Sequence, residues 1–507
     1  MKIEDFFNLY RGFSKEDFLE FKKFLNSPYL VNNKALSRIF EEISNNSNLL
    51  IKSDFDKLLK KISKKSKHSS STIIQRLSSL NKATLIFFKI KSLLSDVENS
   101  ELSLNDYLLK NKNYSLLKSN LKKTSRIIYD SEKITEKFLL NSFNYNVQIC
   151  DSFVNNIRFV KHESAGQILS FLCNASIDLS LYSLMQQINL YAFNYFLDVD
   201  SGNCEKFYFP IDIYKMLEEF DKNNLFSQPS REKSIYELYK LMFLALYRRE
   251  DSENFMKYKQ CFDKTLNSLN KKLIKFHYNM LINYCAMKER LVEERDFYRK
   301  QQVEILLDYT EKGYFKTDDN EHLHSTEYRN FILIAFSIDD FKLLKYFIDN
   351  CTSKLNIKDY DDMMNLGLAF YYYGTKNYEK ALECINNIEI NNFIYRFDIR
   401  NILLRVYYET GEFNKLLDSI HNYRRIIFDD RILNKSIKDS LLNLLKYLNK
   451  IIIIRNNPNL NLQEEAEFLI NLVQNEPTFA LKKWILERLG ELSKTTKEKE
   501  MPLSISI

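Results

Sequence analysis

Apolar residues recur at intervals of three and four along most of this chain, which is the spacing of one face of an α-helix. Leu181, Leu184, Ile188 and Tyr191 form one such stripe, and short polar breaks separate it from the stripes on either side. The 507 residues include only 8 Gly and 6 Pro. Because both residues disfavour helix interiors, their scarcity agrees with the spacing. The pattern predicts an all-α fold.

One stretch, 361–425, contains the same pattern twice. With a shift of 35 residues, six pairs of positions coincide: Leu368 with Leu403, Ala369 with Leu404, Tyr372 with Tyr407, Tyr378 with Phe413, Ala381 with Leu416, and Ile385 with Ile420. Each half predicts a helix, a polar break and a second helix. One amphipathic pair cannot bury its apolar face alone, so such pairs stack on their neighbours. We therefore expect a helix-pair solenoid.

The first half resembles the consensus of the tetratricopeptide repeat family at five positions: Leu368, Ala369, Tyr372, Tyr378 and Ala381. The second half has Leu404 and Leu416 where the family usually has small residues. Asn365 and Arg400 stand where the family has tryptophan, and the closing proline is missing from both halves. The resemblance implies that the first helix of each pair lines a concave groove, which in that family holds peptides or partner helices.

The resemblance also implies which residues would meet a partner. The matching positions are Phe370 and Tyr373 in the first half, and Asn401, Arg405 and Tyr408 in the second. Aromatic and arginine side chains contribute strongly to binding at protein interfaces. The competing interpretation is that these rings pack between neighbouring repeats. Our first hypothesis is a non-catalytic protein–protein interaction scaffold, whose partner is a protein or peptide in the groove.

The breaks in the pattern divide the chain into parts. We expect a basic helical amino-terminal domain at 1–100, a helical segment at 101–200, a tetratricopeptide-like α-solenoid at 211–495 and a disordered tail at 496–507. The polar, acidic segment 95–106 predicts the first boundary. Near the start, SKEDFLEFKKFLNSPYL resembles the opening of a group of uncharacterised bacterial helical proteins. In that phrase, Ser14 and Asp17 have the spacing of a helix-capping box.

Positive charge is concentrated near the amino terminus. The net charge is +7, and residues 52–91 carry eleven Lys and Arg against two Asp, a balance of +9. Seven of these side chains could neutralise phosphates of a nucleic acid: Lys57, Lys60, Lys61, Lys64, Lys65, Lys67 and Arg76. Two predicted helices joined by a short loop carry them, so a nucleic-acid-associated regulator is our second hypothesis. The alternative is a solvated lysine-rich face.

Cysteine usage and hydropathy favour a cytoplasmic protein. The seven cysteines are widely spaced, and no pair has metal-ligand or redox spacing, so we expect small buried hydrophobes in a reducing compartment. Glu4 and Asp5 argue against a secretory signal. The most apolar stretch by inspection, 441–454, contains two lysines and is too short to cross a bilayer, so we expect no membrane contact.

No reacting constellation stands out, so an enzyme is the third and least favoured hypothesis. His322 and His324 are two residues apart and would not chelate a metal from one helix face; a loop or helix start is the better interpretation. Paired aspartates such as Asp339–Asp340 precede apolar runs, where aspartate caps helices. Phosphate loops and zinc frames are missing from the sequence. We expect no cofactor, no metal and no catalytic residue.

Overall fold

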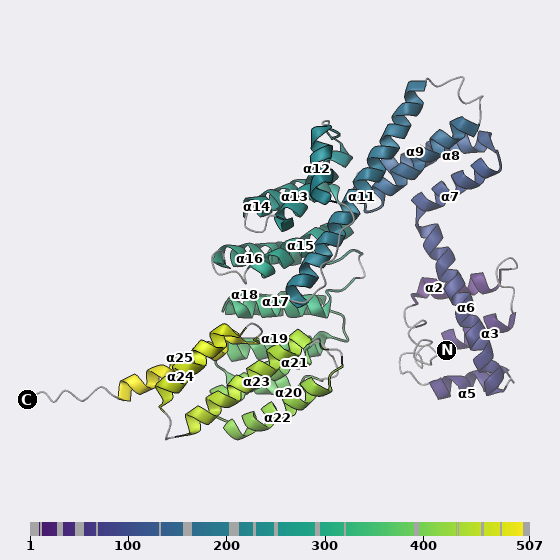
Figure 1. The fold of residues 1–507 in the computed structure, drawn as a ribbon. Coiled ribbons are helices and arrows are strands. Elements are labelled where there is room, and N and C mark those ends of the chain that lie inside the picture. Colours follow the sequence, from purple (N-terminus) through teal and green to yellow (C-terminus); the bar gives the residue numbers. More distant parts are fainter. Residues whose placement is uncertain are drawn as a thin grey trace, which may run out of the picture. The chain divides into compact units, whose positions relative to one another are not determined.

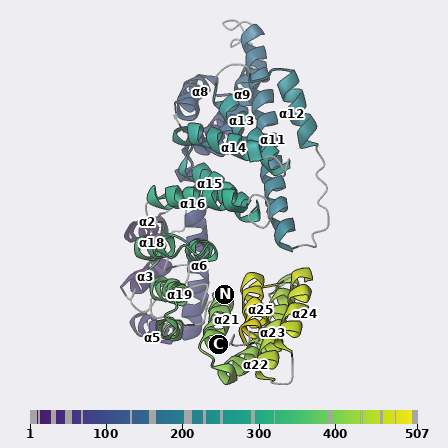
Figure 2. The ribbon, with the colours of Figure 1, turned by 90° about the vertical axis from the view of Figure 1, so that its left-hand side faces the viewer.

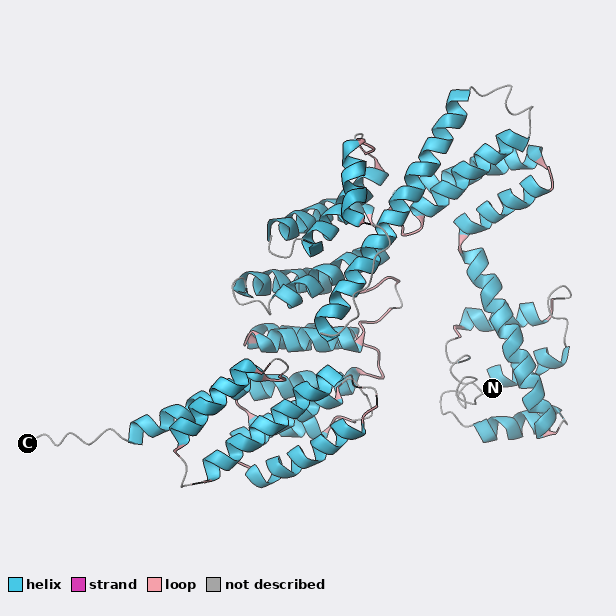
Figure 3. Ribbon diagram, in the orientation of Figure 1, coloured by secondary structure: helices cyan, strands magenta, loops and turns pink. Residues whose placement is uncertain are grey.

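The computed structural model describes residues 10, 13–27, 34–45, 55–66, 69–130, 133–155, 165–201, 212–226, 230–247, 252–288, 295–318, 321–389, 395–431, 433, 435–457, 461–476 and 479–499. These ranges are mostly α-helical and contain no β-strand, only two isolated bridges (Figure 3). The predicted all-α fold is confirmed. The chain forms two compact units, Met1–Glu132 with Lys137–Ser180, and Lys133–Glu136 with Leu181–Ile507.

The first unit begins with a core rich in phenylalanine. Its helices are α2 (Lys15–Leu25), α3 (Lys34–Ser44), α5 (Phe55–Ser66), α6 (Ser70–Ser95), α7 (Val97–Lys110), α8 (Tyr114–Tyr129), α9 (Phe138–Asn155) and the start of α11 (Ala165–Ser201) (Figure 1). Phe21 and Phe40 meet edge to face, with ring centroids 4.8 Å apart. The capping box at Ser14 and Asp17 is confirmed: each side chain accepts a hydrogen bond from the other residue's backbone N–H.

The acidic segment 95–106 contains the break between α6 and α7 at Asp96, but most of it belongs to α7. One face of α7 packs on α8 and α9 through buried polar side chains. Asn105 donates to Thr124 Oγ1 at 3.1 Å and to Gln148 Oε1 at 3.0 Å. Polar residues therefore mark an internal hydrogen-bond network here, and the domain boundary predicted at residue 100 falls inside a helix.

The second unit consists mainly of consecutive helix pairs. After the end of α11 come α12 (Ile213–Lys222), α13 (Arg231–Tyr247), α14 (Ser252–Thr265), α15 (Lys271–Lys288), α16 (Arg295–Glu311), α17 (Ser325–Ser337), α18 (Phe341–Cys351), α19 (Tyr360–Gly374), α20 (Tyr378–Asn386), α21 (Arg396–Glu409) and α22 (Phe413–Asp429). From α13 onward each helix packs on its partner in the pair, and α17, α19 and α21 also contact one another in turn (Figure 1). The helices predicted within 361–425 are α19 to α22.

A recurring turn joins the helices within three of these pairs, and also joins α7 to α8 in the first unit. One residue adopts a left-handed conformation, and the next N–H bonds to the carbonyl five residues back. The left-handed residues are Lys112 (φ 55°), Asp339 (φ 58°), Lys376 (φ 61°) and Gly411 (φ 74°). In each case the following helix begins two residues later with an aromatic residue: Tyr114, Phe341, Tyr378 or Phe413. Only Gly411 has the residue type that favours this conformation.

Three further helices follow: α23 (Lys435–Asn456), α24 (Leu462–Asn475) and α25 (Lys482–Lys499). They pack against one another beside α22 (Figure 2). The apolar stretch 441–454 lies in α23, where Leu444, Leu445 and Leu448 are fully buried. The tail predicted at 496–507 overlaps α25 as far as Lys499, and the remaining residues lie outside the described ranges.

Within the described residues, α11 is the helix long and apolar enough to cross a membrane, by length and composition. Within Gly166–Phe196, an 18-residue window reaches a mean hydropathy of 1.4, and 28% of that window is buried. Inspection of the sequence missed it and selected 441–454 instead. One helix of this kind is weak evidence for a membrane protein, because the core helix of a soluble protein meets the same criterion. The buried stripe predicted within α11 is confirmed at Leu181, Leu184 and Ile188.

Candidate functional site

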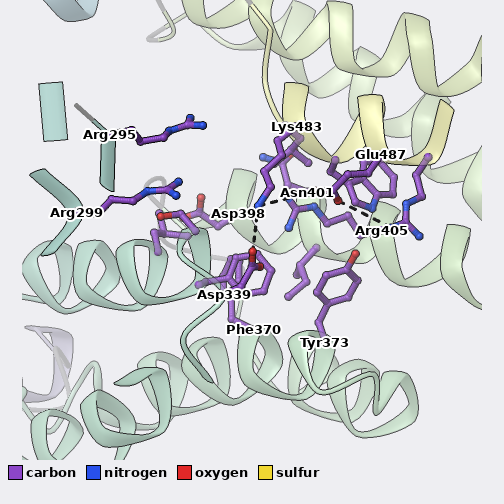
Figure 4. Close-up of a pocket in the computed structure, with 17 residues that line it drawn as sticks. Arg295, Arg299, Asp339, Phe370, Tyr373, Asp398, Asn401, Arg405, Lys483 and Glu487 are labelled. Carbon is purple, nitrogen blue, oxygen red and sulfur yellow. Dashed lines mark hydrogen bonds and ion pairs between the residues drawn. The ribbon is translucent and has the colours of Figure 1, made fainter. Parts of the chain in front are cut away.

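A cavity of about 460 Å³ lies in the second unit, walled mainly by α17, α19, α21 and α25 (Figure 4). Its volume is within the range of small-molecule and peptide side-chain sites. Phe370, Tyr373, Asn401 and Arg405, four of the five residues predicted to meet a partner, line this cavity. They come from the first helices of two successive pairs. The structure therefore gathers them at one place.

Helix geometry explains the convergence. Phe370 and Tyr373 are three residues apart on α19, and Asn401 and Arg405 are four apart on α21, so each pair shares a helix face. Helices α19 and α21 pack side by side. Gly367 lies one turn before Phe370 and allows α19 to approach α17 and α18 closely: a Cβ atom there would be 2.7 Å from Tyr328 Oη.

Tyr408, the fifth predicted residue, lies outside the cavity. It is 4% exposed, and its ring packs edge to face on Trp484 with centroids 5.5 Å apart. Tyr408 is one turn beyond Arg405 on the same face of α21, where α25 covers that face. For Tyr408, the structure matches the competing interpretation of core packing.

Glu409 fixes α25 over the cavity. Its carboxylate accepts hydrogen bonds from Trp484 Nε1 at 3.1 Å and Arg488 Nη1 at 3.0 Å, both on α25. Tyr373 Oη on α19 donates to the same carboxylate at 3.4 Å. Glu409 is the last residue of α21, so one side chain joins three walls of the cavity.

Arg405 is a buried cation surrounded by aromatic rings. Its side chain is about nine-tenths buried, and its Cζ atom lies 5.4 Å from the ring centroid of Phe336 and 5.7 Å from those of Tyr373 and Trp484. Burial lowers the pKa of the guanidinium below its usual range, although nearby Tyr373, Glu487 and Glu409 counteract this. Arg405 forms no hydrogen bond or ion pair with any described residue, and its Nε atom is fully buried.

Other charged groups in the wall are paired. Lys483 Nζ lies 3.0 Å from Asp339 Oδ2, a contact drawn in Figure 4. Asp398 receives two bonds from Arg329 on α17, one of them from Nη2 at 2.9 Å. Arg488 is paired with Glu409. Two further arginines of the wall, Arg295 and Arg299, come from α16 and have interactions of their own; Arg299 lies 4.0 Å from Asp296. Arg405 differs from these groups because the rings are its only contacts of this kind among the described residues.

The residues predicted to contact nucleic acid lie in α5 and α6 of the first unit. Lys57, Lys60, Lys61 and Lys64 are exposed on α5, and Arg76 is half-buried on α6. The side chain of Lys65 and all of Lys67 lie outside the described residues. The exposed lysines suit either a phosphate-binding face or a solvated one, so nucleic-acid binding stays a prediction.

The other candidate residues have structural roles. His324 caps α17: its Nδ1 accepts a hydrogen bond from Thr326 N at 3.3 Å. Asp340 caps α18 by accepting from Lys342 N and Leu343 N. Within the described ranges, no group of three or more His, Cys, Asp or Glu side chains is arranged to hold a metal ion.

The described cysteines carry no disulfide. Four of the six, Cys150, Cys285, Cys351 and Cys384, are buried as expected. Cys173 is exposed on α11, which contradicts the expectation for that residue. Leu169 and Leu172, close to Cys173 on α11, are exposed as well. Cys204 lies outside the described residues.

Another cavity, of about 480 Å³, lies between the ends of α14, α16 and α18, and no sequence pattern indicates it. Five lysines contribute to its wall: Lys133, Lys271, Lys312, Lys316 and Lys354. These lysines are spread over more than 200 residues of sequence, so no local charge run marks them. Lys312 is paired with Asp308 at 2.6 Å, and Lys354 donates to the Thr310 carbonyl.

Comparison of the chain with protein-family models, with curated proteins and with solved structures finds no match.

Proposed function

We propose that this chain is a non-catalytic interaction scaffold that binds a protein or peptide partner in the cavity between α17, α19, α21 and α25. The observation that carries the proposal is the convergence of Phe370, Tyr373, Asn401 and Arg405 on one concave site. Aromatic and arginine side chains in a partly closed site are typical of residues that dominate binding energy. Most titratable groups around the site hold helices together, which suits binding better than proton transfer.

We further propose that the pairs from α13 to α22 form a tetratricopeptide-like solenoid. The recurring left-handed turn and the contacts of α17 with α19, and of α19 with α21, support this. Ala369 and Ala381, which occupy small-residue positions of the resemblance, are fully buried. A cytoplasmic location is part of the same proposal, supported by the free state of the six described cysteines.

The test fills the cavity without removing a buried contact. Ser337 is exposed at the end of α17 and lines the site, so Ser337→Phe places a ring at its mouth. The matched control is Ser79→Phe, at an exposed position of α6 in the first unit. Affinity purification from the native cell should recover partners with the wild type and the control that the Ser337→Phe protein loses. Recovery of the same proteins by all three would reject the proposal.

A further inference from the structure

Arg405 raises a question that the scaffold proposal leaves open, namely what compensates its charge. A buried guanidinium normally pairs with a carboxylate, because removing a charge from water costs several kcal/mol that only close partners offset. Arg405 has no such partner among the described residues, although its side chain is about nine-tenths buried. Lys483 and Arg488, elsewhere in the wall, each have a carboxylate within 3.0 Å.

The three rings around Arg405, together with the more distant carboxylates of Glu487 and Glu409, compensate only part of this cost. A cation over an aromatic face gains about 0.5–2 kcal/mol, and Phe336, Tyr373 and Trp484 each lie within 6 Å of the guanidinium carbon. Aromatic rings accept N–H hydrogen bonds only weakly, and no described residue provides an oxygen acceptor for the N–H groups of Arg405. The N–H groups of a guanidinium are the part that binds carboxylates in a two-pronged geometry.

We infer that the cavity binds a single carboxylate attached to an apolar body, with Arg405 as the group that receives the carboxylate. This inference rests on the proposed function, because it names the chemistry that the partner presents at the same cavity. A ligand with one negative charge would balance the charge of Arg405, and the remaining described cations of the wall have interactions of their own. Phe336, Phe370 and Trp484 provide the apolar surface for the rest of the ligand.

A phosphate fits this site less well than a carboxylate. Phosphate carries more charge than one free guanidinium compensates, and it has no apolar part to contact the rings. The geometry therefore points to an acidic side chain next to an apolar residue of a partner, or to a free organic acid of the same chemistry. Both present one carboxylate beside a hydrophobic group.

The experiment uses the full chain and the fluorescence of Trp484, which is the only tryptophan and lies beside Arg405. We would titrate 3-phenylpropionate, its neutral amide 3-phenylpropionamide, and inorganic phosphate at constant ionic strength. The acid should change the fluorescence saturably, and the amide should bind at least tenfold more weakly. Equal binding of acid and amide, or equal binding of phosphate, would overturn the inference.

Two variants assign the effect to the residue. Arg405→Gln should weaken binding of the acid at least tenfold, whereas Arg425→Gln, at an exposed position of the neighbouring helix α22, should leave it unchanged. Unchanged affinity in a folded Arg405→Gln protein would also overturn the inference. If that variant does not fold, Arg405→Lys replaces it, because lysine keeps the charge but lacks the two-pronged N–H geometry of the guanidinium. If neither variant folds, the comparison of acid and amide binding to the wild type decides the question.

A second arm identifies the source of the carboxylate. An acetylated, amidated tripeptide Phe-Glu-Leu that binds through Arg405 more tightly than 3-phenylpropionate indicates a partner protein, and its Gln counterpart is the control. Binding of the small acid without the peptide indicates a free organic acid. If neither acid binds while Ser337→Phe still loses partners, the scaffold proposal stands and the inference about Arg405 fails.

Discussion

Gly367 lets helices approach so closely that the smallest added side chain should destabilise the second unit. A Cβ atom at this position would lie 2.7 Å from Tyr328 Oη and 2.9 Å from Ile348 Cγ1. Neither neighbour can move easily: Tyr328 is fully buried and hydrogen-bonded to Thr352 at 3.0 Å, and Ile348 is 2% exposed. The Gly367→Ala protein must therefore displace packed atoms of α17 and α18.

The expected magnitude is a difference of two effects. Overpacking of a well-filled core costs about 1–3 kcal/mol, and two contacts below 3 Å place this site near the upper end. Alanine gains up to about 1 kcal/mol over glycine through its helix propensity. We expect a net loss of about 2 kcal/mol in the free energy of unfolding. The matched control is Gly490→Ala in α25, where an added Cβ meets nothing within 4 Å and the helix propensity should give a gain of up to about 1 kcal/mol.

Urea unfolding followed by the fluorescence of Trp484 measures both variants, because the single tryptophan reports on the second unit and not on the first. The urea midpoint should fall for Gly367→Ala and rise for Gly490→Ala at an unchanged slope. A midpoint for Gly367→Ala at or above that of the wild type would show that the close approach does not restrict this position.

Three further predictions concern other parts of the second unit. Lys376→Gly should raise the free energy of unfolding by about 1 kcal/mol, because it removes the cost of a left-handed lysine at φ 61°, and a lower urea midpoint would contradict this. Arg329→Met should lower the free energy of unfolding by about 2 kcal/mol, because it leaves Asp398 without its ion-pair partner. This is less than the loss expected for a fully buried ion pair, since the Arg329 side chain is 24% exposed. An unchanged urea midpoint would show that Asp398 needs no partner. Burial lowers the pKa of His277 from 6.5 to about 3, so its neutral form stabilises the fold fully above pH 6.5, and this contribution is lost as the pH falls toward 3. His277→Phe should therefore reduce the loss of stability measured between pH 7 and pH 5, and an equal loss in both proteins would disprove this assignment.

The sequence predicted those features that short-range patterns determine. Ser14 and Asp17 form the expected cap because its spacing is local. The resemblance grouped Phe370, Tyr373, Asn401 and Arg405, which line one cavity because residues three and four apart share a helix face; contact with a partner stays a prediction. The left-handed conformations of Lys112, Asp339 and Lys376 were not predictable in this way, since glycine is the usual signal and only Gly411 provides it.

The features that the sequence did not predict depend on contacts between residues far apart along the chain. Trp484 covers Tyr408 from 76 positions further along the chain, and no periodicity indicates that α25 would turn back onto α21. The segment 95–106 looked like a boundary because it is polar, but its polar groups bond to α8 and α9. Composition alone does not distinguish a solvated loop from a buried hydrogen-bond network.

Glu409 has a consequence for how this protein would respond to proteolysis. Because its carboxylate holds Trp484 and Arg488, a cleavage just before α25 would remove both donors and one of the three rings around Arg405. The trimmed chain would keep the helix pairs from α13 to α22 but open the aromatic side of the cavity to solvent. Removal of the carboxyl-terminal helix would then change which molecules the protein recognises, and not merely its length.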